Sequence, residues 1–363
     1  MANKTARLGD LATYINGYAF KPADWGDTGL PIIRIQDLTG NSYQLNRYDG
    51  EYPERIEVND GDVLISWSAS LGVYVWQRGK ALLNQHIFKV VFDKLPVNKE
   101  YFVFAVEHKL AEMESKTHGA TMKHIVKKDF DGTTIPYPPI EKQAEIADHL
   151  RRITSIIDRQ TEQLLLLDQL VKSRFIELFG DPLSNDKGWK KVVIAEVCHA
   201  IFGGGTPSKS HPEYFAGSIP WVSPKDMKSS VINDSIDHIT EEAIAHSTTN
   251  LVPANSVLMV IRSGILKHSL PVAINSLPVT INQDMKAFVP NETVKTAFLM
   301  HFFKAIENDV LAGVRGVTAD NIDFKAFQKR TIIVPPLALQ EQFAAFVEQT
   351  DKSKLCGTME VAA

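Results

Sequence analysis

The chain has 363 residues, of which 44% are hydrophobic and 23% are charged, and its formal net charge is −4. This length predicts at least two globular domains, and no apolar run is long enough to suggest a membrane-spanning helix. Residues 1–10 lack the apolar core of a signal peptide, and two distant cysteines do not suggest a disulfide framework or a zinc site. We therefore expect a soluble, cytoplasmic protein.

The sequence pattern of residues 1–139 predicts a mixed α/β domain. Short β-rich runs bounded by Gly, Asp and Asn predict strands within 61–68 and 86–92, and an amphipathic pattern predicts a helix over 98–115. A further strand then leads through Pro138 and Pro139 toward a second helix. The two prolines predict a fixed joint, because proline holds the preceding residue extended and suits the first turn of a helix.

A long helix is predicted for residues 140–180, because neither Gly nor Pro interrupts the chain from Ile140 to Phe179. At about 1.5 Å per residue, it would be a rod of roughly 60 Å. Its apolar residues recur every seven positions, which favours a coiled-coil spacer over a helix buried inside one domain. The residues expected to dock a partner helix or subunit, here and in the last helix, are Ile146, Leu150, Ile153, Ile157, Leu164, Leu167, Val171, Leu178, Phe343, Phe346 and Val347.

Residues 181–336 are predicted to repeat the first domain. At an offset of 197 residues, 119–147 align without a gap on 316–344, which places Gln143 on Gln340 and Pro138 on Pro335. Weaker similarities precede this window, such as "LPIIRIQDL" with "IPWVSPKDM". We interpret the pattern as a duplicated domain, with a strand within 257–264 and a helix over 294–311 in the second copy.

Residues 337–363 are predicted to begin a second spacer helix. We expect it to run from about Leu339 to Leu355 and to stop at "CGTMEVAA", so it looks truncated beside the first helix. Such a helix would cover about half of the apolar seam. The remainder would then need a partner subunit or a second copy of this chain.

Motifs for catalysis are incomplete. In "GGGTPSKS" (203–210), Ser208 stands where a phosphate-binding loop needs Gly, and Pro207 removes a backbone donor. The segment "PYPP" lacks the leading Asp or Asn of a base-flipping methyltransferase motif. Glu107 and Lys109 resemble part of a nuclease motif but lie in a predicted helix. We therefore predict no catalytic residue, no metal site and no cofactor in this chain.

Polar side chains near the predicted strand ends and the joint are candidates for contacting DNA. Arg, Asn and Gln pair with base edges, whereas Lys mostly contacts phosphates. The alternative for each residue is a turn hydrogen bond or a solvated surface. The candidates in the first domain are Arg34, Gln36, Asp37, Ser66, Trp67, Asn84, Gln85, His86, Lys116, Lys123, His124, Lys127 and Lys128. Those in the second are Ser208, Lys209, Trp221, Ser223, Lys225, Asp226, Arg262, Ser263, Lys267, Asn282, Gln283, Arg315 and Thr318.

The succession of domain, helix, domain and helix resembles the specificity subunit of type I restriction–modification systems, the HsdS family, over the whole chain. Both Pro-Pro joints carry the resemblance, through Pro138, Pro139, Ile140 and Gln143 and through Pro335, Pro336, Leu337 and Gln340. The family's Gly-x-Thr-Pro-Ser stretch is matched by residues 204–208. The resemblance implies two target-recognition domains with curled β-sheets, separated by coiled-coil spacer helices.

The same resemblance implies a non-catalytic subunit that reads a bipartite, asymmetric site in double-stranded DNA. Its implied partners are methyltransferase subunits, which use S-adenosylmethionine, and restriction–translocase subunits, which use ATP and Mg²⁺. A coiled-coil scaffold that assembles partners without reading DNA is the alternative, and a stand-alone DNA enzyme is a third interpretation. Sequence-specific binding in the presence of the methyltransferase would separate the first two.

Overall fold

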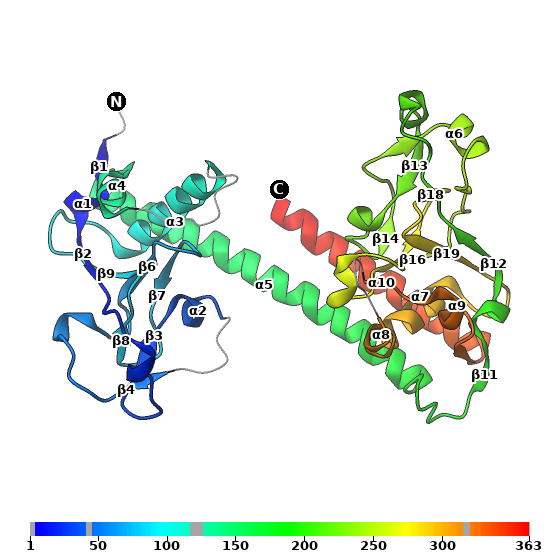
Figure 1. The fold of residues 1–363 in the computed structure, drawn as a ribbon, viewed down its shortest axis with the longest axis horizontal. Helices are drawn as coiled ribbons and strands as arrows, with labels where there is room; N and C mark the ends of the chain where they lie inside the picture. Colours follow the sequence, from blue (N-terminus) through cyan, green and yellow to red (C-terminus); the bar gives the residue numbers. More distant parts are fainter. Residues whose placement is uncertain (1–3, 41–45, 117–125, 315–319, 363) are drawn as a thin grey trace. The chain divides into compact units, whose positions relative to one another are not determined.

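The computed structural model describes residues 4–40, 46–116, 126–314 and 320–362, without the side chains of 114–116 and 355–362. The chain divides into two compact units, Met1–Ile157 and Asp158–Ala363 (Figure 1). The division falls inside a continuous helix, α5 (Ile140–Phe179). Both units mix helices with strands, which confirms the predicted α/β class.

Unit 1 is built on two four-stranded sheets and a two-stranded ribbon. The strand orders are β2-β9-β6-β7, β4-β3-β8-β5 and β1-β10. The strands are β1 (Thr5–Arg7), β2 (Thr13–Asn16), β3 (Leu30–Ile33), β4 (Arg47–Tyr48), β5 (Glu57–Val58), β6 (Val63–Ser66), β7 (Gly72–Val75), β8 (Ala81–Leu83), β9 (Ile87–Val91) and β10 (Thr134–Pro136). Most neighbours are antiparallel, but β3 and β8 are parallel, so their carboxyl ends meet at the same edge.

The helices of unit 1 close its hydrophobic core. They are α1 (Leu8–Leu11), α2 (Ile35–Leu38), α3 (Lys99–Lys116), α4 (Lys127–Gly132) and the first part of α5. Phe102 and Val106 of α3 are fully buried against Phe88 of β9 and Phe130 of α4. The predicted strands within 61–68 and 86–92 and the predicted helix over 98–115 are confirmed as β6, β9 and α3.

Unit 2 repeats this plan with a larger sheet. The strand orders are β12-β19-β16-β17-β14, β15-β13-β18 and β11-β20. The strands are β11 (Lys190–Val193), β12 (Cys198–Gly203), β13 (Ile219–Val222), β14 (Val231–Ile232), β15 (His238–Ile239), β16 (Val257–Val260), β17 (Val272–Asn275), β18 (Thr280–Ile281), β19 (Met285–Pro290) and β20 (Thr331–Val334). Two pairs in unit 2 are parallel: β13 with β18, which corresponds to β3 with β8 of unit 1, and β14 with β17.

The helices of unit 2 differ from the prediction in one place. They are the end of α5, α6 (Glu241–Ala245), α7 (Thr296–Ala305), α8 (Glu307–Ala312), α9 (Phe324–Phe327) and α10 (Leu337–Ala362). The single helix predicted over 294–311 is two helices, α7 and α8. They part at Ile306, whose backbone leaves the helical region while its side chain stays buried in the core.

A buried glutamine secures each joint between strand and spacer helix. The Gln143 amide donates to the Pro138 carbonyl at 2.8 Å, and its oxygen accepts from the Asn98 backbone N–H at 3.0 Å. In unit 2, Gln340 has a carbonyl partner in Pro335, also at 2.8 Å. Both glutamine side chains are fully buried, so the joint that recurs in the sequence is also the same local structure.

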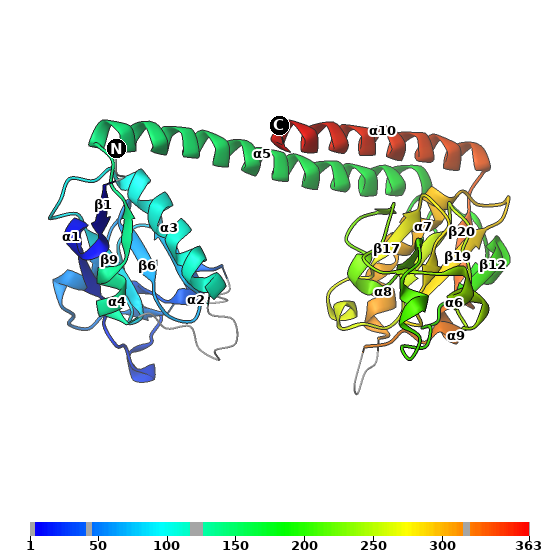
Figure 2. The same cartoon turned by 90° about the horizontal axis from the view of Figure 1, so that it is seen from above.

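Within unit 2, α10 runs antiparallel to the segment of α5 that follows Asp158 (Figure 2). Phe343 near the start of α10 packs on Phe175 at a centroid distance of 5.4 Å. Further along α10, the Lys354 ammonium pairs with Asp168 of α5 at 2.7 Å. The prediction that this helix stops at Leu355 is wrong, since α10 continues to Ala362. A single Gly inside a helix costs only about 1 kcal/mol, which is too little to end it here.

The predicted seam of α5 is buried at one end and exposed in the middle. Val171 is buried against the core of unit 2, together with Phe343 and Val347 of α10, while Leu178 and Phe346 pack at its border. In unit 1, by contrast, Ile153 and Ile157 are 53% and 45% exposed. The remaining predicted seam residues, Ile146, Leu150, Leu164 and Leu167, are half-buried.

Candidate nucleic-acid interface

In each unit the candidate polar residues gather where two parallel strands end. In unit 1, Arg34 follows β3 and Asn84 follows β8, and the Asn84 N–H donates to the Ile33 carbonyl at 3.2 Å. In unit 2, Ser223 follows β13 and Asn282 follows β18, and the Asn282 N–H donates to the Val222 carbonyl at 2.9 Å. The duplication thus places corresponding sequence positions at the same edge in both units.

A glycine allows the chain to pass close to each of these edges. A methyl group at Gly17 would overlap the backbone carbonyl of Asn84, and one at Gly204 would overlap that of Asn282. The adjoining residue of each segment donates its N–H to the neighbouring strand, Tyr18 to Leu83 and Gly205 to Ile281. The Gly run at 203–205 therefore serves close backbone packing.

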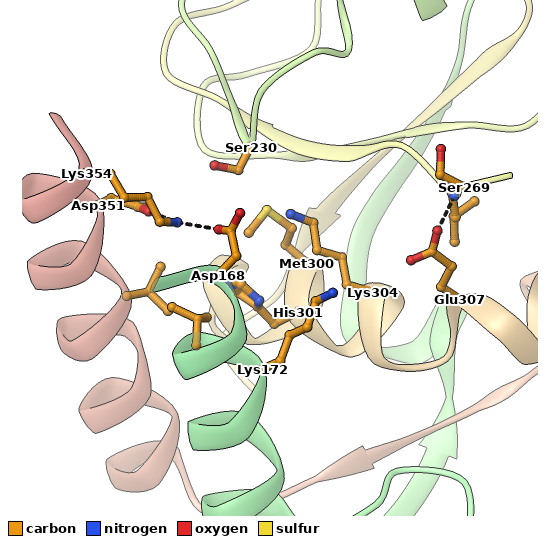
Figure 3. Close-up of a pocket in the computed structure, with 13 residues that line it drawn as sticks. Asp168, Lys172, Ser230, Ser269, Met300, His301, Lys304, Glu307, Asp351 and Lys354 are labelled. Carbon is orange, nitrogen blue, oxygen red and sulfur yellow. Dashed lines mark hydrogen bonds and ion pairs between the residues drawn. The ribbon is translucent and has the colours of Figure 1, made fainter. Parts of the chain in front are cut away.

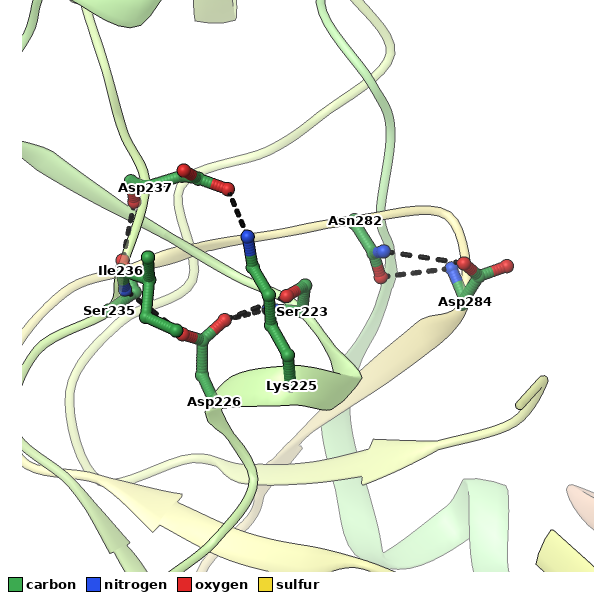
Figure 4. Close-up of polar contacts among 8 residues, drawn as sticks. All are labelled: Ser223, Lys225, Asp226, Ser235, Ile236, Asp237, Asn282 and Asp284. Atoms are coloured by element: carbon green, nitrogen blue, oxygen red, sulfur yellow. Dashed lines mark hydrogen bonds and ion pairs between the residues drawn. The ribbon is translucent and has the colours of Figure 1, made fainter. Parts of the chain in front are cut away.

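A short helical turn begins at each edge and is capped by an aspartate. In unit 1, Asp37 accepts from the backbone N–H of Arg34 at 2.8 Å and from its guanidinium at 3.2 Å. In unit 2, where the turn is the 3₁₀ helix η5 (Pro224–Asp226), Asp226 accepts from both the N–H and the hydroxyl of Ser223 at 2.8 Å (Figure 4). Asp37 and Ser223 are buried, so both residues shape the turn.

The edge in unit 2 opens into a groove of about 720 Å³. Its lining combines two lysines, two aromatic rings and several polar groups: Lys209, Pro212, Phe215, Trp221, Ser223, Pro224, Lys225, Asp237 and Asn282. Trp221 is fixed by its indole N–H, which donates to the Gly205 carbonyl at 3.0 Å, and Phe215 packs edge-on against it at 5.9 Å. Lysines suit phosphates, and aromatic faces suit bases or sugars.

One ion pair orients the Lys225 side chain in this groove. The Lys225 ammonium lies 2.6 Å from a carboxylate oxygen of Asp237 (Figure 4), and this hydrogen bond raises the pKa of Lys225. Lys225 is therefore a permanent cation at neutral pH. Its side chain is half exposed, so a phosphate could replace Asp237 as its partner.

Asp284 connects the edge to a second group of candidates. It accepts from the Asn282 amide at 3.3 Å and lies 3.8 Å from the Arg262 guanidinium. Gln283 is exposed and its side chain contacts Thr206. Lys267 lies apart, at the end of the 3₁₀ helix η6 (Gly264–Lys267), and pairs with Asp320 at 3.8 Å.

Two serine candidates have structural partners. The Ser263 hydroxyl accepts from the Ile265 N–H and so caps η6. The Ser66 hydroxyl is fully buried and donates to the Ser70 carbonyl at 2.5 Å. Ser208, in contrast, is exposed beside Ser210. Ser66, Ser223 and Asp37 therefore belong to the interior, and we leave these three out of the proposed DNA-contacting surface.

The remaining candidates of unit 1 are divided between surface and interior. Gln36, Gln85 and Lys128 are exposed, whereas Trp67 stacks on Phe88 at 5.4 Å. Arg34 lies over the ring of Trp25 at 5.8 Å, and His86 has a left-handed backbone with φ of 71°. Lys127 pairs with Asp131 at 3.1 Å. The side chains of Lys116, Lys123, His124, Arg315 and Thr318 lie outside the described part of the structure.

Sequence analysis missed four residues that line the groove, namely Pro212, Phe215, Asp237 and Pro224. The first two belong to the 3₁₀ helix η4 (Pro212–Phe215), and Asp237 immediately precedes β15. No spacing or periodicity in the sequence relates these segments to Lys225. The antiparallel pairing of β13 with β15 brings Asp237 to the edge, and the packing of Phe215 on Trp221 brings η4 there.

The described residues contain no group of three His, Cys, Asp or Glu side chains arranged to hold a metal ion. Among the helices of the same residues, none is long and apolar enough to cross a bilayer.

One protein-family model matches both halves of the chain. The model of the type I restriction modification DNA specificity domain matches residues 2–167 and again 186–356. The specificity subunit of the type I restriction enzyme EcoR124I/EcoR124II of Escherichia coli is 41% identical over 222 residues, which cover 60% of this chain and 53% of that protein. The MjaIX specificity subunit of Methanocaldococcus jannaschii is 31% identical over 353 residues, covering 89% and 80%. The chain thus spans about half the length of the first of these relatives.

Solved structures share the fold. The S subunit of a type I restriction–modification system from M. genitalium has a TM-score of 0.61 at 13% identity, covering 99% of this chain and 92% of the other. A chain from a structure on complex assembly and conformational transition of the type I R-M system has a TM-score of 0.55 at 17% identity, covering 99% and 93%.

Proposed function

Because the chain belongs to the family of type I restriction–modification specificity subunits, we propose that it selects the DNA sequence on which such a complex acts and is not itself catalytic. The observation that carries this proposal is the duplicated strand edge. Both units use the same backbone hydrogen bond to hold an Asn there, yet in the adjacent turn the exposed Gln36 of one unit stands where the exposed Lys225 stands in the other. A shared framework with different side chains is what reading two different half-sites requires.

In unit 2 we assign DNA contact to the groove around Lys225. Lys209 and Lys225 would neutralise phosphates, while Asn282, Gln283 and Arg262 would approach base edges. Asp284 supports this role, because it orients both Asn282 and Arg262. In unit 1 the corresponding surface comprises Arg34, Gln36, Asn84, Gln85, Lys127 and Lys128.

We further propose that the spacer helices dock the methyltransferase subunits. The part of α5 in unit 2 carries exposed apolar side chains, with Leu165, Leu166 and Leu170 at 59%, 55% and 49%. In unit 1 Ile153 and Ile156 are similarly exposed. Apolar stripes of this kind are covered in a working assembly. The S-adenosylmethionine, ATP and Mg²⁺ of the reaction would belong to the partner subunits.

The test is methylation mapping with the full chain and a methyltransferase partner. The complex should methylate adenine at one bipartite sequence, and neither component should do so alone. Replacing residues 190–330 by the corresponding domain of a relative should change one half-site and leave the other unchanged. If methylation follows no sequence, the chain is a scaffold and does not specify the site. If both half-sites change together, the two units do not read their half-sites independently.

A further inference from the structure

A second cavity lies in unit 2, where α5, α7 and α10 converge. Its volume is about 260 Å³, and seven ionisable side chains line it: Asp168, Lys172, His301, Lys304, Glu307, Asp351 and Lys354 (Figure 3). A neighbouring cavity of about 290 Å³ shares Lys172, His301, Lys304 and Glu307 with it. This place is not part of the strand edge assigned to DNA.

The acidic groups of the cavity already have partners. The Lys354 ammonium pairs with Asp168 at 2.7 Å and with Asp351 at 2.9 Å (Figure 3). Glu307 accepts from the backbone N–H of Leu270 at 2.6 Å (Figure 3). One lysine therefore serves two aspartates, and the third carboxylate is bound to the main chain.

The remaining basic groups have no such partners. Among the described residues, neither Lys172 nor Lys304 makes a hydrogen bond or ion pair, although both line the cavity. His301 is only 9% exposed, and its Nε2 atom is buried without a hydrogen-bond partner. Buried polar atoms are normally satisfied, so the His301 nitrogen lacks an expected partner. Lys304 is half-buried and Lys172 is exposed at the mouth of the cavity, so both ammonium groups are free to approach a ligand there. These three groups come from facing helices, Lys172 from α5 and the other two from α7 (Figure 3).

From this arrangement we propose that the cavity binds a small oxyanion of the phosphate type, held by Lys172 and Lys304 and by a hydrogen bond from His301. A tetrahedral oxyanion has enough acceptor oxygens for three donors that converge from two helices. The cavity has room for it, since one water occupies about 30 Å³ of liquid. A cation would be repelled by the two lysines, and an apolar group would leave the buried His301 nitrogen unsatisfied.

The electrostatics of the cavity are consistent with an anion. Burial lowers the pKa of Lys304; the Asp168 carboxylate opposes this shift, while the neighbouring Lys354 adds to it. Burial likewise lowers the pKa of His301 to about 3, so its ring is neutral and can carry its one hydrogen on Nε2. A bound anion would favour the charged form of Lys304 and remove the cost of burying it.

Titration calorimetry of the full chain with inorganic phosphate tests the site, with chloride adjusted to keep ionic strength constant. A second titration uses a nucleoside 5′-monophosphate, which distinguishes free phosphate from a nucleotide as the source of the group. Lys172→Met and Lys304→Met should each weaken binding about tenfold or more, because each removes a charge-assisted hydrogen bond. Lys352→Met, on the exposed side of α10, should leave it unchanged.

Amine labelling of the unmodified chain provides a measurement that does not depend on variants folding. Phosphate should slow the acylation of Lys172 and Lys304, read by peptide mass spectrometry, and leave Lys352 unaffected. The proposal is overturned if neither anion binds beyond the chloride control. It is also overturned if phosphate binds but does not slow the acylation of Lys172 and Lys304.

Discussion

The backbone N–H of Lys295 donates to the side-chain oxygen of Gln340 at 2.8 Å, across 45 positions of sequence. The Gln340 amide also donates to the carbonyls of Pro335 at 2.8 Å and Thr293 at 3.2 Å. One fully buried side chain thus fastens the start of α10 to the start of α7. This explains why Gln accompanies the Pro-Pro pair at both joints.

Replacing this glutamine should destabilise unit 2. Gln340→Leu removes the partners of several buried backbone groups, and each unsatisfied group costs about 1–3 kcal/mol. We expect the free energy of unfolding, measured with denaturant, to fall by at least that amount. Gln342→Leu is the matched control, because Gln342 is exposed two positions along the same helix. Equal effects of the two substitutions would contradict the role of the joint.

The close approach at Gly204 should not tolerate a side chain. Gly204→Ala would force the Gly run away from the Asn282 carbonyl, at a cost of about 1–3 kcal/mol. It should also weaken DNA binding, because Asn282 stands at the proposed surface. Gly264→Ala is the control in the same unit, since nothing lies within 4 Å of its added methyl. A thermal melt and a DNA-binding titration of both variants measure the two effects.

Lys225 should contribute to DNA affinity without selecting bases. Lys225→Gln removes one phosphate-neutralising charge, so the slope of log affinity against log salt should decrease by about 1. Affinity should drop similarly for cognate and altered sites. Lys190→Gln, on β11 away from the groove lining, should change neither quantity. Fluorescence anisotropy at several salt concentrations, with the methyltransferase present, provides the measurement; a change in preferred sequence would argue for base contact instead.

Acid should weaken unit 2 through His301. Its pKa is about 3 in the folded chain and about 6.5 when unfolded, so the unfolded chain binds an additional proton between these values. Stability is therefore complete above about pH 6.5 and falls toward pH 3, by at most about 1.4 kcal/mol per pH unit. The groups that shape this titration are Lys304 of α7, Lys354 of α10 and Lys172 of α5, with Asp168 and Asp351 nearby.

Two histidine variants isolate this contribution. His301→Phe should flatten the dependence of unfolding free energy on pH between 4 and 6.5, since Phe cannot bind the proton. His268→Phe, at an exposed position, should retain the pH dependence of the unmodified chain. Denaturant titrations at four or five pH values suffice, and an unchanged slope in His301→Phe would assign the acid sensitivity to other groups.

The exposed leucines of α5 should be needed for assembly but not for folding. Leu166→Glu with Leu170→Glu should leave the melting temperature nearly unchanged, because both side chains are about half exposed. The double variant should fail to co-purify with the methyltransferase and should reduce self-association of the isolated chain. Sedimentation velocity reads the second effect. An unmodified chain that is monomeric at micromolar concentration without a partner would contradict the proposed exposed seam.

The duplication can be predicted from the sequence because each joint is a short motif whose residues are neighbours along the chain. Pro138, Gln143 and their counterparts lie within a few residues of each other. The groove is different, because Asp237 meets Lys225 through strand pairing and Phe215 reaches the groove through tertiary packing on Trp221. The phosphate cavity is harder still, since Lys172 and Lys304 lie in helices 132 positions apart along the printed chain and face each other only after α5 and α7 pack.

Gln143 and Gln340 bind main-chain atoms, the carbonyl of a proline and the N–H at the start of an earlier helix, and Gln340 also donates to the Thr293 carbonyl. That N–H belongs to Asn98 in one unit and to Lys295 in the other, so the identity of the residue does not matter. A recombination event that exchanged residues 180–334, between the end of α5 and the second Pro-Pro pair, would keep both spacer helices and meet the same main-chain requirement at the second joint. Selection could therefore replace a whole recognition module in one step, and acquire a new DNA target, while the spacer helices and the subunits bound to them stayed unaltered.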